Sequence, residues 1–314
     1  MPQFSVIIPA FNAAATIART VECVLAQTSS DFEIIVVDDG STDSTREVLE
    51  RYAAQIRIVS QANRGLSAAR NAGASLARAR WLALLDADDT WTADKLEEIA
   101  RALPLYPDAV MLFSDAICFD LSGTIAHGPF MPPQLAHAPS REEMMAGRFQ
   151  ILPSSAVIRR DTWERAGGFS EEFHGASGFE DAWFWLLLRE QGPFAYLPAR
   201  LVNYRVAPLI TRLERYRPGF AIFTRLVRER YGVAGEPLIR ARRDARVSLW
   251  ARAGLIALAE GRAAEARYAF RNALRENPQR LKNLLRLCRT YLPTALARAL
   301  TKSARDRAST DEPE

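Results

Sequence analysis

The stretch that most constrains the fold is an apolar run that ends in acidic residues. Residues 81–85, Trp-Leu-Ala-Leu-Leu, have the length and composition of a strand buried on both faces, and Asp86, Asp88 and Asp89 follow almost directly. In open α/β sheets, ligands bind just beyond the carboxyl ends of the strands. The sequence therefore predicts a mainly parallel sheet with an acidic binding edge.

Asp86 and Asp88 form an Asp-x-Asp pair. In an extended segment, side chains two residues apart project to the same side, so both carboxylates can face one ligand. Mutual repulsion disfavours such a cluster unless a cation neutralises it, and Mg²⁺ or Mn²⁺ binds carboxylates together with substrate phosphates. The alternative interpretation is a solvated acidic turn that caps a helix beginning near Thr92.

The length of 314 residues allows one large or two modest domains. No apolar run reaches the roughly 18 residues that a membrane-spanning helix needs, and no basic segment precedes the first apolar run as in a signal peptide. The three cysteines, Cys23, Cys118 and Cys288, are far apart, which favours a reducing compartment without disulfides. We therefore expect a cytoplasmic protein.

Charge is distributed unevenly along the chain. Residues 240–309 hold 17 basic and 5 acidic side chains, net +12, whereas residues 1–239 hold 24 and 29, net −5. Leucines interleave with the basic residues, a pattern typical of helices that lie on anionic membranes, so peripheral contact with the inner face of the membrane is one expectation. A packed helix with a solvated basic face is the alternative, and no nucleic-acid-binding motif accompanies the charge.

Strand and helix patterns alternate over the first hundred residues, which predicts a parallel sheet with right-handed crossovers. We expect strands at 4–8, 32–37, 56–60 and 81–86, and helices at 14–27, 41–54, 66–79 and 92–103. Ser41 or Thr42 is expected to cap the second of these helices. Further strands are expected near 110–115, 154–159, 194–198 and 201–205, and helices from about residue 213 onward. Residues 254–278 are expected to form a packed helical hairpin.

Two other acidic pairs follow predicted elements. Asp38 and Asp39 come after the second strand, and Glu180 and Asp181 begin an aromatic helix. The first pair falls at the same sheet edge as Asp86 and Asp88, the edge at which α/β sheets bind nucleotides. The dinucleotide glycine fingerprint and the Gly-x-x-x-x-Gly-Lys phosphate loop are both absent from the sequence. A metal on Asp88 would then neutralise the phosphates.

Four motifs together resemble the signature of family 2 glycosyltransferases with the GT-A fold. They are VIIPAFN at 6–12, VVDDGSTD at 36–43, NRGLSAARNAG at 63–73 and LDADD at 85–89. The resemblance covers about residues 3–206. It implies a Rossmann-like, mainly parallel sheet flanked by helices in a catalytic domain over 1–210. A smaller basic helical region over 211–302 and a disordered tail over 303–314 are expected to follow.

The resemblance also implies a nucleotide-sugar donor, most often a UDP-sugar, that is bound through a divalent metal. By this resemblance Pro9, Ala10 and Phe11 lie around the base with Asn12 beside them, and Asp39 accepts a hydrogen bond from a base N–H. Arg70 lies near the uridine or diphosphate, and Asp86 and Ala87 lie at the ribose or sugar. Asp88 is the implied ligand of Mn²⁺ or Mg²⁺.

Glu180 and Asp181 match the Glu-Asp pair of the family, which implies that Asp181 is the general base. The attacking hydroxyl must lose its proton as it bonds to the anomeric carbon. A base opposite the leaving diphosphate gives inversion, and the metal stabilises the departing charge. For Glu180, orienting the acceptor and capping the helix both remain open.

The sequence departs from the family after Tyr204 and Arg205, where many members carry a histidine and residues 206–208 are Val-Ala-Pro. Arg205 or Arg212 is then an alternative ligand for the diphosphate. The Gln-x-x-Arg-Trp motif of processive synthases is absent. We therefore expect the addition of one hexosyl-type sugar to a saccharide or lipid-linked acceptor in cell-surface polysaccharide biosynthesis. A non-catalytic nucleotide-sugar sensor or scaffold on the same fold is the alternative.

Overall fold

The computed structural model of the protein describes residues 1–291 except 121–123, 148, 177, 208 and 280. The chain forms two compact units, one of residues 1–207 with 215–232 and one of 208–214 with 233 onward. The first unit therefore includes most of helix α8 (Leu209–Tyr231). The predicted tail at 303–314 lies outside the described residues.

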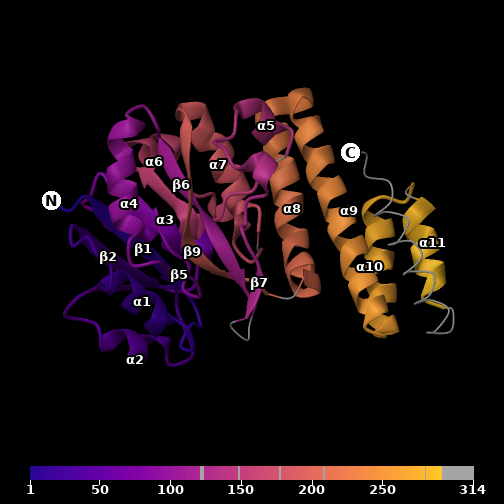
Figure 1. The fold of residues 1–314 in the computed structure, drawn as a ribbon, viewed down its shortest axis with the longest axis horizontal. Helices are drawn as coiled ribbons and strands as arrows, with labels where there is room; N and C mark the ends of the chain where they lie inside the picture. Colours follow the sequence, from indigo (N-terminus) through magenta and orange to yellow (C-terminus); the bar gives the residue numbers. More distant parts are fainter. Residues whose placement is uncertain (121–123, 148, 177, 208, 280, 292–314) are drawn as a thin grey trace. The chain divides into compact units, whose positions relative to one another are not determined.

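The first half of the sheet is parallel, and the predicted α/β architecture is confirmed (Figure 1). Its strands lie in the order β3-β2-β1-β4. Their bounds are β1 Phe4–Ala10, β2 Phe32–Asp38, β3 Arg57–Ser60 and β4 Trp81–Leu84, connected by helices α1 Ile17–Leu25, α2 Thr45–Glu50 and α3 Leu66–Leu76. Strands β1 and β4 are buried along their whole length, as continuous apolar runs require.

Helix α3 packs closely against β1 and β2 because its inner face carries small residues. A Cβ atom on Gly73 would lie 2.6 Å from Cγ2 of Ile7 and 3.4 Å from Cγ2 of Val37. Ala68, Ala69 and Ala74 are also buried on this helix. The glycine in the third motif thus sets how near α3 approaches the sheet.

The second half of the sheet is mixed. Strand β8 (Ala156–Arg159) runs antiparallel to both β4 and β6 (Met111–Phe119), and β6 runs parallel to β9 (Phe194–Arg205). The short strand β5 (Thr90–Trp91) pairs antiparallel with β9, and β7 (Ile125–His127) pairs with β6. These pairings bring the end of β9 next to the segment that follows Asp86.

Strand β9 is one strand where the sequence predicts two. Its pairing with β6 shifts register between Ser114 and Ala116, so that residues 198, 199 and 201 have no partner in β6. Pro198 interrupts the apolar pattern there because proline cannot donate to the ladder. The bulge, not a chain reversal, separates the two predicted strands.

The remaining helices of the first unit lie beside this sheet. They are α4 Lys95–Ala102, α5 Arg141–Met145, α6 Arg160–Ala166 and α7 Glu180–Gln191, with 3₁₀ turns at Leu103–Leu105, Pro133–Leu135, Pro153–Ser155 and Glu171–Phe173. A further 3₁₀ turn, Gly232–Gly235, lies where the first unit ends and the second continues. Helix α4 begins three residues later than predicted, because Thr90 and Trp91 form β5.

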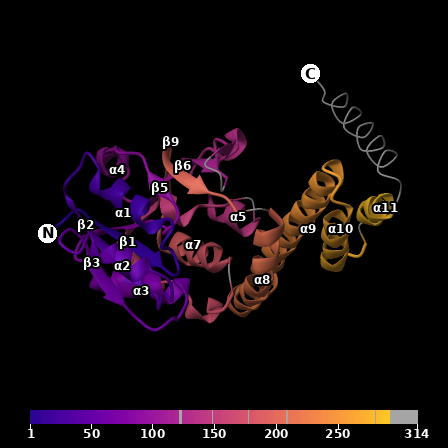
Figure 2. The same cartoon turned by 90° about the horizontal axis from the view of Figure 1, so that it is seen from below.

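The second unit is built on a helical hairpin, as predicted for residues 254–278. Helix α9 (Glu236–Ala259) lies alongside α10 (Ala263–Glu276), which contacts α11 (Leu281–Arg289) (Figure 2). A Cβ atom at residue 254 would lie 2.7 Å from the ring of Phe270, which shows how tightly the hairpin packs. Among the described residues, no helix is long and apolar enough to cross a membrane.

Lys95 is fully buried at the first residue of α4. Its Nζ lies 3.2 Å from the carbonyl oxygen of Ser155, 3.4 Å from Oγ of Ser114 and 5.2 Å from the ring centroid of Trp91. Burial lowers the pKa of Lys95 to about 7 because these neutral groups only partly replace water.

Lys95 makes stability depend on pH. Between about pH 7 and 10.5 the unfolded chain binds a proton that the folded chain does not, so the free energy of unfolding rises with pH over this window. We expect Lys95→Met to gain about 1–4 kcal/mol at pH 7 and to lose this pH dependence. Urea unfolding of both proteins at pH 7 and pH 9 measures it, and identical pH slopes would contradict the prediction.

Candidate active site

The carboxyl ends of the parallel strands β1, β2 and β4 lie at one edge of the sheet, and two of the acidic motifs follow β2 and β4 there. Register places Ala10 beside Asp38, and the backbone N–H of Asp39 donates to the carbonyl of Ala10 at 2.8 Å. The predicted edge therefore exists, with the first two motifs in direct contact.

Asp39 is 2% exposed and binds the third motif. Its Oδ1 accepts from Nε2 of Gln61 at 2.7 Å and from the backbone N–H of Arg64 at 2.9 Å, and its Oδ2 accepts from the N–H of Gly65 at 2.7 Å. Gly65 has φ +87°, and a Cβ atom there would lie 2.9 Å from Nδ1 of His174. One Oδ2 lone pair has no donor among these contacts.

The residues after β1 divide into buried and exposed ones. Pro9 and Ala10 are buried, whereas the ring of Phe11 is 50% exposed at the edge. Asn12 has φ +49°, and its Oδ1 accepts from the backbone N–H of Thr42 at 2.8 Å. The side chain of Asn12 therefore holds the turn of the second motif.

The cap of α2 differs from the prediction. Ser44, not Ser41 or Thr42, is the N-cap residue, and its side chain makes no capping bond. Asp43 accepts from the N–H of Thr45 at 3.0 Å instead. The capping prediction failed because Asx turns place the useful oxygen one or two residues from the helix start.

The acidic loop after β4 is held from three sides. The hydroxyl of Thr20 donates to the carbonyls of Ala87 at 3.0 Å and Asp89 at 2.9 Å. Oγ of Ser154 accepts from the N–H of Asp86 at 3.0 Å and donates to Oδ2 of Asp89 at 2.5 Å. The N–H of Arg205 donates to Oδ1 of Asp89 at 2.8 Å. Asp89 is thus a structural carboxylate that joins β4 to β9.

Asp88 is the exposed carboxylate of this loop. Loss of solvent around it and then the charge of Asp86 raise the pKa of Asp88, and the guanidinium of Arg205 opposes this shift. Burial and the charges of Asp88 and Asp86 hold the pKa of Asp89 well above its usual range. A cation at this loop would relieve that repulsion.

A metal here would have few protein ligands. Within the described part of the chain, no three His, Cys, Asp or Glu side chains group closely enough to hold an ion. The exposed carboxylate of Asp88 fits Mg²⁺ or Mn²⁺ bound through one carboxylate, waters and phosphate oxygens. The residues present therefore fit a metal that takes most of its ligands from groups other than protein side chains.

Arg70 is completely buried on α3. Its Nη2 donates to Oδ1 of Asp86 at 2.6 Å and its Nη1 to Oε1 of Glu180 at 3.4 Å, and its guanidinium lies 4.8 Å from the ring centroid of Phe169. Nε of Arg70 and Oε2 of Glu180 are buried without a hydrogen-bond partner among the described residues.

Glu180 and Asp181 begin α7 after an unusual turn. Phe179 has φ +73°, a conformation that is rare for residues other than glycine. Burial raises the pKa of Glu180 to about 7, Asp181 adds to the shift, and Arg70 opposes it. Asp181 is half-buried, and its charge acts on both Arg70 and Glu180. The structure therefore brings the predicted base to the group that contains Asp86.

Several residues that position the site carry no motif signal. Thr20, Ser154 and Phe169 lie outside the four motifs, and the spacing of apolar residues does not mark them as part of a site. The charge of the Arg205 guanidinium opposes the rise in the pKa of Asp88, so the two side chains interact. From the sequence, Arg205 is an alternative ligand for the diphosphate. The side chain of Arg212 is outside the described residues.

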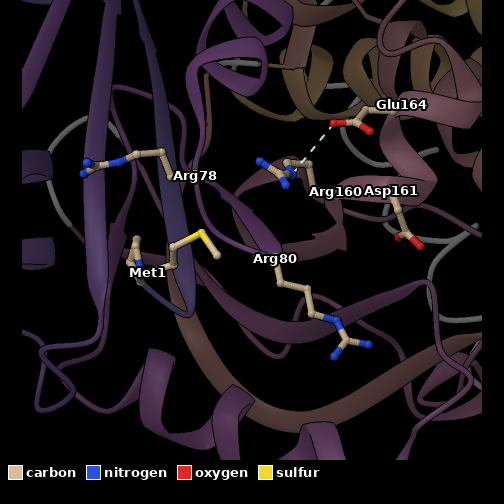
Figure 3. Close-up of a pocket in the computed structure, with 7 residues that line it drawn as sticks. Met1, Arg78, Arg80, Arg160, Asp161 and Glu164 are labelled. Atoms are coloured by element: carbon tan, nitrogen blue, oxygen red, sulfur yellow. Dashed lines mark ion pairs between the residues drawn. The ribbon is translucent and has the colours of Figure 1, made fainter.

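A hollow of about 420 Å³ lies at the opposite edge of the sheet (Figure 3). Arg78 and Arg80 precede β4, and Arg160 follows β8, which is antiparallel to β4. The charges around this hollow are largely balanced, because Arg78 pairs with Glu33 and Arg160 pairs with Glu164. This hollow is separate from the acidic edge.

Residues 5–160 match the sequence model of glycosyl transferase family 2. The chain belongs to this family. It is 29% identical over 204 residues to chondroitin synthase of Escherichia coli, covering 63% of this chain and 28% of that one. It is 46% identical over 169 residues to an uncharacterised glycosyltransferase of Nostoc sp., covering 52% of each chain.

The fold is similar to that of TarS from S. aureus, solved as residues 1–349 with UDP. The TM-score is 0.60 at 17% sequence identity, covering 98% of this chain and 92% of that one. TarS has also been solved with UDP-GlcNAc. At this identity the likeness shows the fold alone, and this fold confirms the GT-A prediction.

Proposed function

We propose that the protein is an inverting glycosyltransferase that moves one hexosyl-type sugar from a UDP-sugar to a hydroxyl of a saccharide or lipid-linked acceptor. The carrying observation is that Arg70 joins the Asp-x-Asp loop to the Glu180–Asp181 helix start at the sheet edge where Asp39 lies. The bound UDP of TarS supports the donor class, and the chondroitin synthase relative supports a role in polysaccharide biosynthesis.

The base of the donor would lie over the end of β1. Phe11 offers an exposed ring for stacking, and Pro9 and Ala10 form the buried floor beneath it. Asp39 would accept the base N–H with its remaining lone pair, which uracil satisfies at N3. Because Asp39 is fixed by three donors, it presents that oxygen in a set direction.

The diphosphate would lie beside the acidic loop. Asp88 would hold Mn²⁺ or Mg²⁺, which supplies charge stabilisation for the leaving diphosphate. Asp86 and the backbone at Ala87 would contact the ribose or sugar. Arg205 would act on the diphosphate side, since its guanidinium already acts on Asp88.

Asp181 would remove the proton of the attacking hydroxyl. It is half-buried in the first turn of α7. Its neighbour Glu180 is buried, so Asp181 is the carboxylate of the pair that an acceptor can reach. This division assigns Glu180 to support and Asp181 to catalysis.

A panel of UDP-sugars, tested with Mn²⁺ for thermal stabilisation and for UDP release, tests the proposed function. One donor should stabilise the protein and release UDP faster when acceptor saccharides are added. Stabilisation by UDP-sugars with no transfer to any acceptor would favour the alternative, a nucleotide-sugar sensor or scaffold.

The metal assignment predicts that Asp88→Ala binds UDP no more tightly with Mn²⁺ than without it. The wild-type protein should bind UDP more tightly with Mn²⁺ than in EDTA, because Asp88 would hold the metal, which would neutralise charge on the diphosphate. Calorimetry of both proteins under both conditions measures this. Equal wild-type affinities in Mn²⁺ and EDTA would remove the metal from donor binding.

Asp181→Asn keeps the shape of the side chain but cannot accept the proton. Transfer should fall by about 10²–10⁴-fold, while UDP affinity and the melting temperature stay near wild-type values. Asp31→Asn, an exposed change at the other sheet edge, is the matched control and should transfer normally. A folded Asp181→Asn protein with near-normal transfer would exclude Asp181 as the base.

The second unit would bring the enzyme to an anionic membrane that carries a lipid-linked acceptor. Leu284 and Leu285 on α11 are 45% and 57% exposed, and the unit carries the basic excess. Each basic residue near such a surface contributes about 1 kcal/mol, so a few suffice. No nucleic acid is proposed as a partner.

Flotation with vesicles of phosphatidylglycerol and phosphatidylcholine tests this contact. The protein should float with them, less so at high salt, and not with phosphatidylcholine alone. Leu284→Ser with Leu285→Ser should weaken flotation, whereas Leu105→Ser, which changes an exposed leucine of the first unit, should not. Equal flotation of all variants would refute membrane contact through α11.

A further inference from the structure

One buried guanidinium connects three elements of the first unit. Arg70 on α3 binds Asp86 after β4 and Glu180 at the start of α7, at 2.6 and 3.4 Å. Asp86 lies 16 residues after Arg70, and Glu180 lies 110 residues after it. Arg70 and Glu180 are buried and Asp86 is partly buried, so a change at one carboxylate acts on the other through the same cation.

The guanidinium is also covered and anchored. The ring of Phe169 lies 4.8 Å from it and closes it off from solvent on that side. The next residue of α3, Asn71, makes two hydrogen bonds to the backbone of Phe169. Its Nδ2 donates to the carbonyl oxygen of Phe169 at 2.8 Å, and its Oδ1 accepts from the N–H of Phe169 at 2.9 Å. Arg70 therefore has little freedom to turn toward a bound diphosphate.

We propose that Arg70 is a positioning residue that bridges the donor side and the base side of the site, and that it does not bind the diphosphate. Asp86 binds Nη2 and Glu180 binds Nη1 of the planar guanidinium. The single ammonium group of a lysine does not offer two donors in this fixed geometry. The bridge fixes Glu180 and hence the direction of Asp181, the next residue on α7. This inference rests on the proposed function.

Arg70→Lys keeps the positive charge but removes the fork. UDP and uridine should each bind within about threefold of wild-type affinity, because no phosphate contact is lost. The kcat for UDP release from the donor that the panel selects should fall by about 10–100-fold with KM nearly unchanged, since the base is displaced.

The opposite pattern would overturn the bridge. A loss of tenfold or more in UDP affinity with unchanged uridine affinity would make Arg70 a phosphate ligand. An unchanged kcat would show that the fork positions nothing. Arg78→Lys is the matched control, because Arg78 is exposed and pairs only with Glu33 among the described contacts at the other edge. It should leave every value unchanged.

A second set of variants keeps the inference testable if Arg70→Lys does not fold. Asp86→Asn and Glu180→Gln retain the shapes of the two carboxylates. Their effects on the urea midpoint should be non-additive in the double variant, because both act through one guanidinium. Strictly additive shifts would overturn the bridge.

These outcomes are separable from failure of the proposed function. If the wild-type protein binds no UDP and releases none from any donor, the function fails. The coupling between Asp86→Asn and Glu180→Gln in urea unfolding would still confirm or refute the bridge, since it requires no activity.

Discussion

Repulsion between carboxylates is the constraint on which the site depends. Asp39, Asp86, Asp88, Asp89 and Glu180 all lie at one edge of the sheet, and several of them are buried. Buried charges persist only when they are paired or hydrogen-bonded. The protein meets this requirement with one guanidinium, with backbone N–H groups and with serine and threonine hydroxyls. Each of these contacts also ties a loop to a distant element. The same hydrogen bonds and ion pairs therefore stabilise the carboxylates and hold the loops in position.

The parts of the fold that follow from local pattern could be predicted from the sequence. Buried strands such as 81–84 read as continuous apolar runs, and the small residues of 66–76 already indicate a helix that packs closely on the sheet. The positions of Asp39 and Asp86 follow from the same reasoning, because the ends of parallel strands meet at one edge. Asp181 lies at a helix start, and only the resemblance to the family predicted it as part of the site. That the carboxyl groups converge was predictable, whereas the contacts that hold them were not.

The contacts that hold them join residues far apart in the chain and carry no periodic signal. Ser154 reaches Asp89 across 65 residues, and the N–H of Arg205 reaches it across 116. Both depend on the antiparallel strand β8 and on the pairing of β5 with β9, which apolar patterns do not specify. Lys95 shows the same limit, since a lysine at a helix start reads as solvated and is instead fully buried.

Hydrogen bonding separates carboxylates that support the site from those that can act on a substrate. Asp89 has both oxygens bonded to the protein and is 1% exposed, so it has little capacity for a ligand. Asp39 is nearly as constrained, and one remaining lone pair suits a single directed contact with a base. Asp88 and Asp181 are the more exposed members of their pairs, next to buried Asp89 and Glu180. In each pair the buried acid is fixed and in turn fixes the position of its more exposed neighbour. Rigid support of this kind is what the proposed metal ligand and the proposed general base would both require, because their reaction partners would arrive from solution.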